Sequence, residues 1–410
     1  MTLKWVLMSD PVLLGDVASV VDCEHKTAPV CEPGNEFAFS VGTRALRGGG
    51  IDFSQAKHVD EETYRGWSRR AELRRGDVIL AREAPIGGVG WVSGEPRICL
   101  GQRTVLVRAL PESVDGRFLF YLLQSPQPQE WMHAHGEGST VKHLNVSDVR
   151  RIRLDFFPPL DVQRRIAGVL AALDGLIDTD KRLAGILDEE SRLVGRRFIT
   201  QVSTEPLVPM GEIAQINKGY SYKSAELTHG TQWLVNLKNV GRDGTFQERG
   251  FKPLSGSPKQ QHLIDQGDVV VAQTDLTQAR EVIARPVRVR RMGLEGQLVA
   301  SLDLVSVKPL PGDYITPEYI FAVLDQQAFR DHALGYCNGT TVLHMGAKAI
   351  PEFVAPRPTP QQVGRLTESV RPLRAAADAL LDEASQLSAA RDELLPLLLA
   401  GRVVPGEVEV

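Results

Sequence analysis

The 410-residue sequence has few cysteines, no long apolar run and no large excess of charge of either sign. Its four cysteines, Cys23, Cys31, Cys99 and Cys337, are scattered and form no Cys-x-x-Cys pair. Free thiols in a reducing compartment are therefore favoured over a disulfide framework or a zinc site. No run of 18 apolar residues occurs and no signal-peptide pattern begins the chain, so we expect a cytoplasmic protein without a membrane span.

Motifs of common enzyme sites are also missing. The sequence has no Gly-x-x-x-x-Gly-Lys-Ser/Thr loop, no Gly-x-Gly-x-x-Gly and no His-Glu-x-x-His, and its nine histidines show no metal-ligand spacing. Phe157-Pro158-Pro159-Leu160 lacks the polar first residue of the Asn-Pro-Pro-Tyr motif of amino-methyltransferases. We therefore expect no catalytic residue and no metal site in this chain.

The composition itself is that of an ordinary globular protein, with 42% hydrophobic and 24% charged residues. The length allows two or three domains, each with its own core. A net charge of -4 argues against a generally basic surface. It leaves room for nucleic-acid binding through one local basic face.

Two long stretches carry an apolar seam that alternates three- and four-residue steps, the pattern of a coiled coil. In the first stretch, 158–203, the seam is Ile166, Leu170, Leu173, Ile177, Ala184, Leu187, Val194 and Phe198. In the second, 358–410, it is Val363, Leu366, Val370, Leu373, Ala377, Leu380, Ala384, Leu387, Leu394 and Leu398. Thr359, Pro360 and Gln362 form a capping-box signature that predicts where the second helix starts.

Two packing arrangements are open for these helices. Each could pack on its own globular domain, or the two could form one antiparallel coiled coil. Both seams are longer than a domain of about 150 residues could cover, which favours the coiled coil. Asp180, a polar residue in the first seam, is a candidate for setting the register of the pair.

The chain also repeats itself at an offset of about 200 residues. Residues 14–18 return at 210–214, 76–81 at 267–272, 118–123 at 319–324, and 138–144 at 339–345. Four matches in the same order indicate one unit used twice. We divide the chain into a first globular domain (1–157), a central long helix (158–203), a second globular domain (204–357) and a C-terminal long helix with a tail (358–410).

Each globular part shows β-rich runs separated by Gly and Pro, together with one helical run, and so predicts a mixed α/β fold. In the first part we expect strands at 77–81, 89–92 and 103–107 and a helix at 116–124. In the second we expect strands at 232–240, 268–273, 282–289 and 301–307 and a helix at 317–330.

Cations, amides and aromatic side chains recur in the repeated segments. Arg and Lys neutralise phosphates, and Arg, Asn and Gln bind base edges in pairs. The candidate DNA-facing residues are Arg82, Arg103, Lys142 and His143 in the first half, and Lys218, Tyr222, Lys238, Asn239, Gln273, Gln278 and His344 in the second. Residues 44–75 add a modest basic excess that includes Arg44 and Lys57. One such cluster is more often a solvated face, but recurrence in both halves favours a DNA face.

The chain resembles the specificity subunits of Type I restriction-modification systems. The resemblance rests on the duplication, on the Pro158-Pro159-Leu160-Asp161-Val162-Gln163-Arg164-Arg165-Ile166-Ala167 junction, and on Gly138-Ser139-Thr140-Val141-Lys142-His143-Leu144-Asn145 before the helix. It covers essentially the whole chain. The second junction, 357–365, departs from the pattern because it lacks the Gln-Arg-Arg run.

The resemblance implies two target recognition domains, each reading half of a bipartite double-stranded DNA sequence, joined by two antiparallel helices with pseudo-twofold symmetry. It also implies a non-catalytic subunit that binds two methyltransferase subunits and, through them, restriction subunits. S-adenosylmethionine, ATP and Mg would belong to those partners, with no cofactor in this chain. Two alternatives remain, a coiled-coil scaffold without sequence-specific DNA binding and a single-chain DNA-modifying enzyme.

Overall fold

The computed structural model describes residues 11–403 and 405–406, apart from 138–141, 276–278 and 340–341. It divides the chain into two compact units, Met1–Leu176 with Leu387–Val410, and Ile177–Gln386. We call them unit 1 and unit 2 and describe each by itself.

Unit 1 is built on a four-stranded antiparallel sheet in the order β2-β10-β7-β8. These strands are β2 (Ala18–Asp22), β10 (Thr104–Ala109), β7 (Val78–Arg82) and β8 (Ile86–Trp91). A second sheet places β3 (Ala38–Val41) between β6 (Lys57–Val59) and β9 (Ile98–Leu100), and two short pairs join β1 (Val12–Leu13) to β11 (Arg153–Leu154) and β4 (Leu46–Arg47) to β5 (Gly50–Ile51). The helices are α1 (Leu14–Val17), α2 (Glu61–Trp67), α3 (Gly116–Gln124), α4 (Pro126–His135) and α5 (Val146–Arg150).

Unit 2 repeats this plan. Its antiparallel sheet is β13 (Ala214–Lys218), β21 (Leu304–Pro309), β17 (Val269–Ala272) and β19 (Pro286–Arg288), in that order. A second sheet orders β15 (Lys252–Leu254), β14 (Gln232–Val235), β20 (Gln297–Ala300) and β16 (Leu263–Ile264). The remaining strands are β18 (Thr274–Asp275), β23 (Leu343–Met345) and β22 (Cys337–Asn338) in one sheet and β12 (Leu207–Pro209) with β24 (Val354–Pro356) in another, and the helices are α7 (Pro317–Leu324) and α8 (Gln327–Leu334).

The strand register confirms the internal repeat and the mixed α/β fold class. In each unit the second sheet contains a parallel pair, β3 with β9 and β14 with β20. Val41 lies beside Leu100 in the first pair, and Val235 lies beside Ala300 in the second. These segments of the two units can therefore be aligned residue by residue, which sequence matching alone did not allow.

Some expected elements in unit 2 differ from the observed ones. The expected strand 232–240 ends at Val235 because the Asn236 side chain accepts a hydrogen bond from the Lys238 N–H and starts a 3-10 turn. The expected strand 282–289 is reduced to β19, and the expected helix 317–330 is broken into α7 and α8. Hydrophobic patterning marked these regions correctly but could not detect the side-chain caps and turns that interrupt them.

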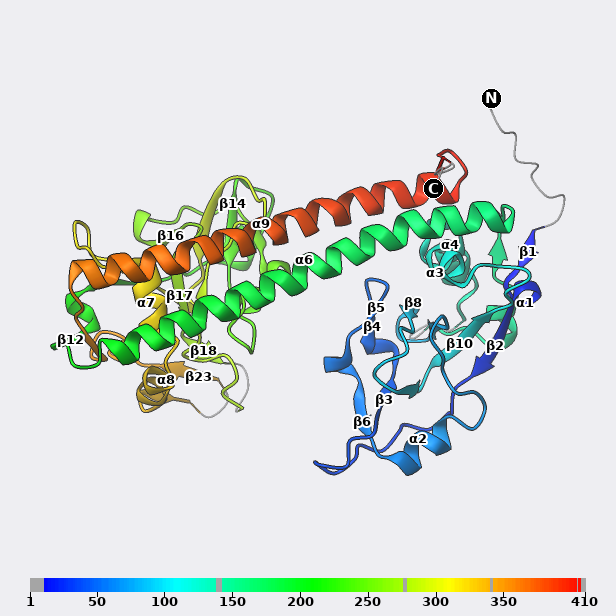
Figure 1. The fold of residues 1–410 in the computed structure, drawn as a ribbon, viewed down its shortest axis with the longest axis horizontal. Coiled ribbons are helices and arrows are strands. Elements are labelled where there is room, and N and C mark those ends of the chain that lie inside the picture. Colours follow the sequence, from blue (N-terminus) through cyan, green and yellow to red (C-terminus); the bar gives the residue numbers. More distant parts are fainter. Residues whose placement is uncertain (1–10, 138–141, 276–278, 340–341, 404, 407–410) are drawn as a thin grey trace. The chain divides into compact units, whose positions relative to one another are not determined.

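The two long helices are α6 (Leu160–Gln201) and α9 (Pro360–Leu399), both drawn in Figure 1. The seam positions expected from the sequence are buried or half-buried in both helices. Thr359 and Gln362 form the expected capping box, because the Gln362 N–H donates to Thr359 Oγ1 and the Thr359 N–H donates to Gln362 Oε1. Among the described residues, no helix is long and apolar enough to cross a membrane.

Each long helix contributes to both hydrophobic cores. Ile166 and Leu170 of α6 pack in the unit 1 core, whereas Phe198 of the same helix packs in the unit 2 core. For α9 the order is reversed, since Val363 lies in the unit 2 core and Leu398 in the unit 1 core. Opposite ends of the two helices therefore meet on the same domain, as in an antiparallel pair. The alternative in which each long helix packs only on the domain that precedes it in the sequence is therefore wrong.

Candidate nucleic-acid interface

In unit 1, the carboxyl end of β7 brings together candidate residues that are far apart in sequence. The backbone N–H of Arg82 donates to the carbonyl oxygen of Arg103 at 3.0 Å. On its other side, the N–H of Leu144 donates to the Arg82 carbonyl oxygen at 2.8 Å. Glu83 forms an isolated β-bridge with His143. Arg82, Arg103, Lys142 and His143 therefore occupy one edge of the unit.

The side chains at this edge differ in availability. Arg82 is only 12% exposed, and its Nε lies 3.4 Å from Asp22 Oδ1 while its Nη1 donates to the Leu144 carbonyl oxygen. Arg103 is 44% exposed and pairs with Glu83 at 3.1 Å. Lys142 is exposed, although its Nζ donates to the His133 carbonyl oxygen at 2.8 Å. Arg82 thus orders the edge, and Arg103 and Lys142 reach solvent.

A cleft of about 390 Å³ lies beside Arg103 in unit 1. It is lined by Arg44, Lys57 and Arg103 together with hydrogen-bonding side chains of Thr27, Ser40, Thr43, Gln55 and Gln102, and no carboxylate lines it. Arg44 and Lys57 are both exposed. Such a surface suits the phosphate groups of a nucleic acid, which cations and neutral donors bind together.

Local structure explains why these cations meet. Lys57 lies opposite Ser40 in the β3 and β6 pair, and Arg44 follows β3 within a 3-10 turn, Thr43–Ala45. The rim is tied by Thr27 Oγ1, which donates to Gln102 Oε1 at 2.9 Å, and by Gln102 Nε2, which donates to the His25 carbonyl oxygen. The cleft is therefore held by backbone register and by a chain of side-chain hydrogen bonds.

Unit 2 carries two of these cations at equivalent positions. Lys252 lies opposite Leu234 in the β14 and β15 pair, which matches Lys57 opposite Ser40. Lys238 follows β14 in the turn Leu237–Asn239, as Arg44 follows β3. Sequence reasoning named Lys238 but missed Lys252, because the signal is a strand register rather than a sequence match.

Gln273 and His344 meet at the edge of unit 2 that corresponds to the Arg82 edge. The Met345 N–H donates to the Gln273 carbonyl oxygen at 2.8 Å, and Thr274 pairs with His344 in the β18 and β23 ladder. Lys218 and Gln273 both line a smaller hollow of about 130 Å³. Lys218 and His344 are exposed. Tyr222 is half-buried and packs against the small core cluster of Leu234, Leu254 and Val299.

Two further candidates stand apart. Asn239 has no exposed surface. Its Oδ1 accepts from the Asn236 N–H at 2.9 Å and its Nδ2 donates to the Gln247 carbonyl oxygen at 2.8 Å. The amide is therefore occupied in holding the turn that presents Lys238, and we leave it out of the DNA-facing set. Gln278 lies outside the described residues.

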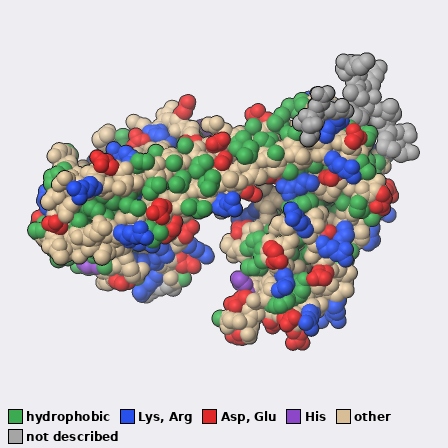
Figure 2. Space-filling model, viewed as in Figure 1, with side chains coloured by type: hydrophobic (Ala, Val, Ile, Leu, Met, Phe, Trp, Pro, Cys, Tyr) green, Lys and Arg blue, Asp and Glu red, His purple; other side chains and the backbone are tan. Residues whose placement is uncertain are grey.

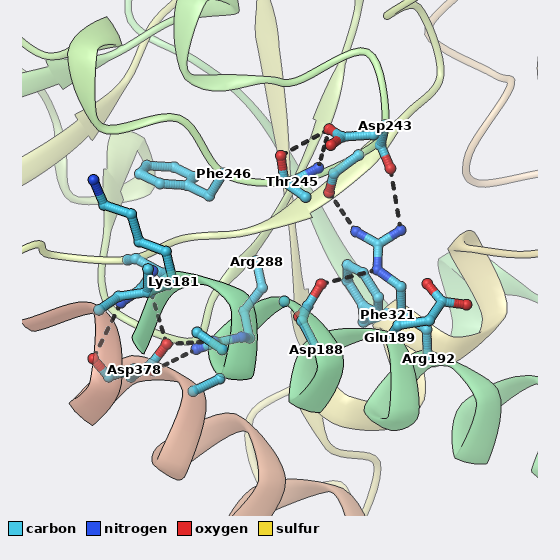
Figure 3. Close-up of a pocket in the computed structure, with 16 residues that line it drawn as sticks. Lys181, Asp188, Glu189, Arg192, Asp243, Thr245, Phe246, Arg288, Phe321 and Asp378 are labelled. Atoms are coloured by element: carbon cyan, nitrogen blue, oxygen red, sulfur yellow. Dashed lines mark hydrogen bonds and ion pairs between the residues drawn. The ribbon is translucent and has the colours of Figure 1, made fainter. Parts of the chain in front are cut away.

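A larger hollow in unit 2, of about 350 Å³, lies between α6, α9 and the strands (Figure 3). Most of the charged side chains that line it have partners within the unit. Asp378 accepts from Arg288 and lies 2.7 Å from Arg290, and Arg192 pairs with Asp188 and donates to the Gly244 carbonyl oxygen. We interpret this network as the attachment of the helices to the domain. The part of the chain that the structure describes has no group of His, Cys, Asp and Glu side chains suited to a metal ion.

Comparison with known proteins agrees with this geometry. Residues 46–186, which include the unit 1 cleft cations Lys57 and Arg103, match the family model described as the Type I restriction modification DNA specificity domain. The MjaVIII specificity subunit of a Type I restriction enzyme from Methanocaldococcus jannaschii is 20% identical over 308 residues, 71% of each chain. The putative MjaX specificity subunit from the same organism is 30% identical over 125 residues, 30% of this chain and 28% of the relative.

A solved structure extends the comparison to the fold of the whole chain. The crystal structure of the S subunit of a Type I restriction-modification system from M. genitalium covers 100% of this chain and 99% of its own, with a TM-score of 0.57 and 14% identity. This likeness shows a shared fold. Residues 46–186 therefore resemble the DNA specificity domain of Type I restriction-modification systems, and the whole chain has the fold of an S subunit. The resemblance to Type I specificity subunits expected from the sequence is confirmed.

Proposed function

We propose that this chain is the DNA-recognition subunit of a Type I restriction-modification system and directs a methyltransferase and endonuclease complex to a bipartite target. Unit 1 would read one half of the target and unit 2 the other. The observation that carries the proposal is the repeated pair of cations, Arg44 with Lys57 and Lys238 with Lys252, on two copies of one fold. A scaffold without DNA binding has no need for cations at matched positions.

The DNA-facing set of this proposal combines the repeated cations with the exposed or half-exposed candidates. It comprises Arg44, Lys57, Arg103, Lys142 and His143 in unit 1, and Lys218, Tyr222, Lys238, Lys252, Gln273 and His344 in unit 2. Arg82 has a positioning role, because its guanidinium is engaged with Asp22 and the Leu144 carbonyl oxygen.

The chain itself would have no catalytic residue. Methylation of adenine by S-adenosylmethionine and ATP-driven restriction, with Mg, would take place in partner subunits. This division agrees with the lack of enzyme motifs in the sequence. The system would act on DNA in the cytoplasm, as a defence against foreign DNA.

One face of α6 supports the binding of partner subunits. Val169, Leu176 and Leu183 follow each other at seven-residue steps and are 38%, 52% and 42% exposed, and Ile186, one turn further, is 59% exposed. Apolar side chains are also seen along the long helices in Figure 2. A regular stripe of exposed apolar residues on a helix is typical of a protein interface. We propose that it binds the methyltransferase subunits.

The decisive experiment maps N6-methyladenine in the genome of the host, with and without the gene for this chain. The proposal expects that methylation at one split sequence motif disappears when the gene is deleted and returns with a plasmid copy. An unchanged methylation map in an expressing host would refute the proposal. The scaffold alternative expects, in addition, that purified complexes bind DNA weakly and without the steep salt dependence of phosphate contacts.

A further inference from the structure

The two units differ at one position beside their shared cations. Gly101 donates its N–H to the Val41 carbonyl oxygen at 2.8 Å, and Ser301 donates to the Val235 carbonyl oxygen at 2.8 Å. This equivalence aligns Gln102 and Arg103 of unit 1 with Leu302 and Asp303 of unit 2. An amide and a cation in one half of the molecule are thus replaced by an apolar side chain and a carboxylate in the other.

The replacement changes the character of the surface. In unit 1, Arg103 joins Arg44 and Lys57 around a cleft that no carboxylate lines. In unit 2, Leu302 is 44% exposed and Asp303 accepts a hydrogen bond from Thr274 Oγ1 at 3.1 Å. The carboxylate places a negative charge where the unit 1 cleft has a positive one, so it repels a phosphate instead of attracting it.

The backbone conformation of Arg103 supports a binding role for its side chain. Arg103 has a φ of 72°, a left-handed conformation that costs energy for most residues other than Gly and Asn. This conformation places Arg103 between Glu83 and the cleft, with 44% of its side chain exposed. A strained residue with an exposed cationic side chain is more typical of a binding site than of a structural turn.

We propose that the unit 1 cleft is a phosphate clamp that supplies the main sequence-independent attraction for DNA, and that the described residues of unit 2 form no equivalent clamp. This inference rests on the proposed function and deepens it. The two halves of the molecule then divide the work unequally. Unit 1 contributes most of the salt-dependent affinity, and unit 2 holds its half of the DNA through Lys238 and Lys252 with weaker electrostatic attraction.

The test measures the affinity of the full-length chain for a mixed-sequence DNA duplex at several salt concentrations, by fluorescence anisotropy. The double variant Arg44→Ala/Lys57→Ala removes two cations of the cleft. Each phosphate contact contributes about 0.9 to the slope of log K against log salt. Raising the salt concentration from 50 to 200 mM should therefore reduce the affinity of the variant by a factor that is roughly tenfold smaller than the factor for the wild type.

The matched control is Lys238→Ala/Lys252→Ala, which removes the same number of positive charges from equivalent positions of unit 2. Its salt slope should change by less than that of the unit 1 variant. Circular dichroism and thermal melting establish that both variants are folded. Equal changes in the two variants, or an unchanged slope in the unit 1 variant, would overturn the unequal division.

A gain-of-function variant gives an independent test. Leu302→Gln/Asp303→Arg introduces the unit 1 residues into unit 2 and should raise the affinity for mixed-sequence DNA and steepen its salt dependence. An affinity at or below that of the wild type would count against the clamp. The proposed function has a separate test, because it is refuted if the host that expresses the wild-type gene shows no methylation at a split sequence motif. A normal motif together with unchanged salt slopes in the cleft variants would refute the clamp alone.

Discussion

Arg391 of α9 donates a hydrogen bond of 2.8 Å to Asp174 of α6. The same carboxylate accepts from Tyr121 and from Arg117, both in α3 of unit 1. Asp174 is only 16% exposed, so it fastens two long helices and a domain helix at one shielded point. This contact explains how the unit 1 domain is attached to the helix pair.

Replacement of Asp174 by Asn should therefore weaken unit 1. The variant leaves Arg117 and Arg391 without their shared anion, and we expect a loss of about 3 kcal/mol in the free energy of unfolding. Urea denaturation measures the loss. Asp161→Asn is the control on the same helix, because Asp161 is 70% exposed in its pair with Arg165, and it should change stability by less than about 1 kcal/mol. Equal losses would contradict the structural role of Asp174.

The Asp378 network predicts a dependence of stability on pH. Burial raises the pKa of Asp378, but hydrogen bonds from Arg288 and the charges of Arg288 and Arg290 outweigh it and hold the pKa below its ordinary value. Because the folded pKa is the lower one, this stabilisation is complete above the unfolded pKa of about 3.9 and is lost as the pH falls below it. Asp378→Asn should cost about 3 kcal/mol at pH 7.

The free energies of unfolding of the wild type and of Asp378→Asn should become more similar as the pH falls below about 4. In that range Asp378 of the wild type becomes protonated and no longer stabilises the fold through its charge. Urea denaturation at pH 7 and in a series below pH 4 checks this. Asp382→Asn serves as the control, because Asp382 is 46% exposed and 4.0 Å from Arg290. A constant difference across the whole pH series would show that the charge of Asp378 is not what stabilises unit 2.

Arg374 is expected to destabilise unit 2. It is 6% exposed, and its Nε has no hydrogen-bond partner. Burial, together with the nearby positive charge of Arg288, lowers the pKa of Arg374 to about 10. Its guanidinium stacks on Phe321 at 4.6 Å. We expect Arg374→Met to fill the same space without a buried charge and to raise the free energy of unfolding by about 1 kcal/mol or more. A loss of stability would mean that stacking on Phe321 outweighs burial.

Asn239 and Lys238 are neighbours with different expected roles. Asn239→Ala leaves the Asn236 N–H and the Gln247 carbonyl oxygen without their partner and should cost about 2 kcal/mol of stability. It should leave the methylated motif unchanged. Lys238→Ala should keep stability within about 0.5 kcal/mol and weaken binding to all DNA sequences. Thermal melting and the anisotropy assay distinguish the two outcomes. Reversed effects would place Asn239, rather than Lys238, at the DNA.

The exposed stripe of α6 predicts loss of partner binding in a folded chain. Leu176→Glu/Leu183→Glu adds charge to two side chains that are 52% and 42% exposed. The double variant should therefore melt like the wild type but fail to co-purify with methyltransferase subunits. Leu207→Glu, at a β12 residue that is 61% exposed, is the control and should co-purify normally. Retention of the partners by the double variant would exclude this face as the interface.

The repeat, the two helices and the mixed α/β class could be predicted because they depend on patterns along the chain. The seam residues, such as Ile166 and Val363, are apolar at helical spacing and are buried in the structure. The pairing of the two helices followed from the length of their seams, and their antiparallel direction followed from the resemblance to Type I specificity subunits. The environment of a single side chain was harder to predict from the sequence. For example, nothing in the sequence reveals that Asp22 pairs with the guanidinium of Arg82.

The placement of the candidate residues could be predicted in part for the same reason. Arg82 and Gln273 directly follow the matched segments 76–81 and 267–272, and they lie at equivalent edges of the two units. Lys252 was missed because its equivalence to Lys57 depends on strand pairing across sequence segments that do not match. Asn239 was included on its chemistry, and only its burial shows that its amide serves the fold. The positions of the DNA-facing residues remain a prediction.

The sharing of the helices also bears on how the protein is synthesised. The unit 1 core contains Leu14 and Leu80 from the start of the chain together with Leu398 and Leu399 from its end. During translation the first domain leaves the ribosome before the residues that cover its core exist. Its exposed apolar surface is then available for chaperones or for misassembly. The last turn of α9 closes the first domain, so a truncation that removes Leu398 and Leu399 should damage the half of the protein that was made first.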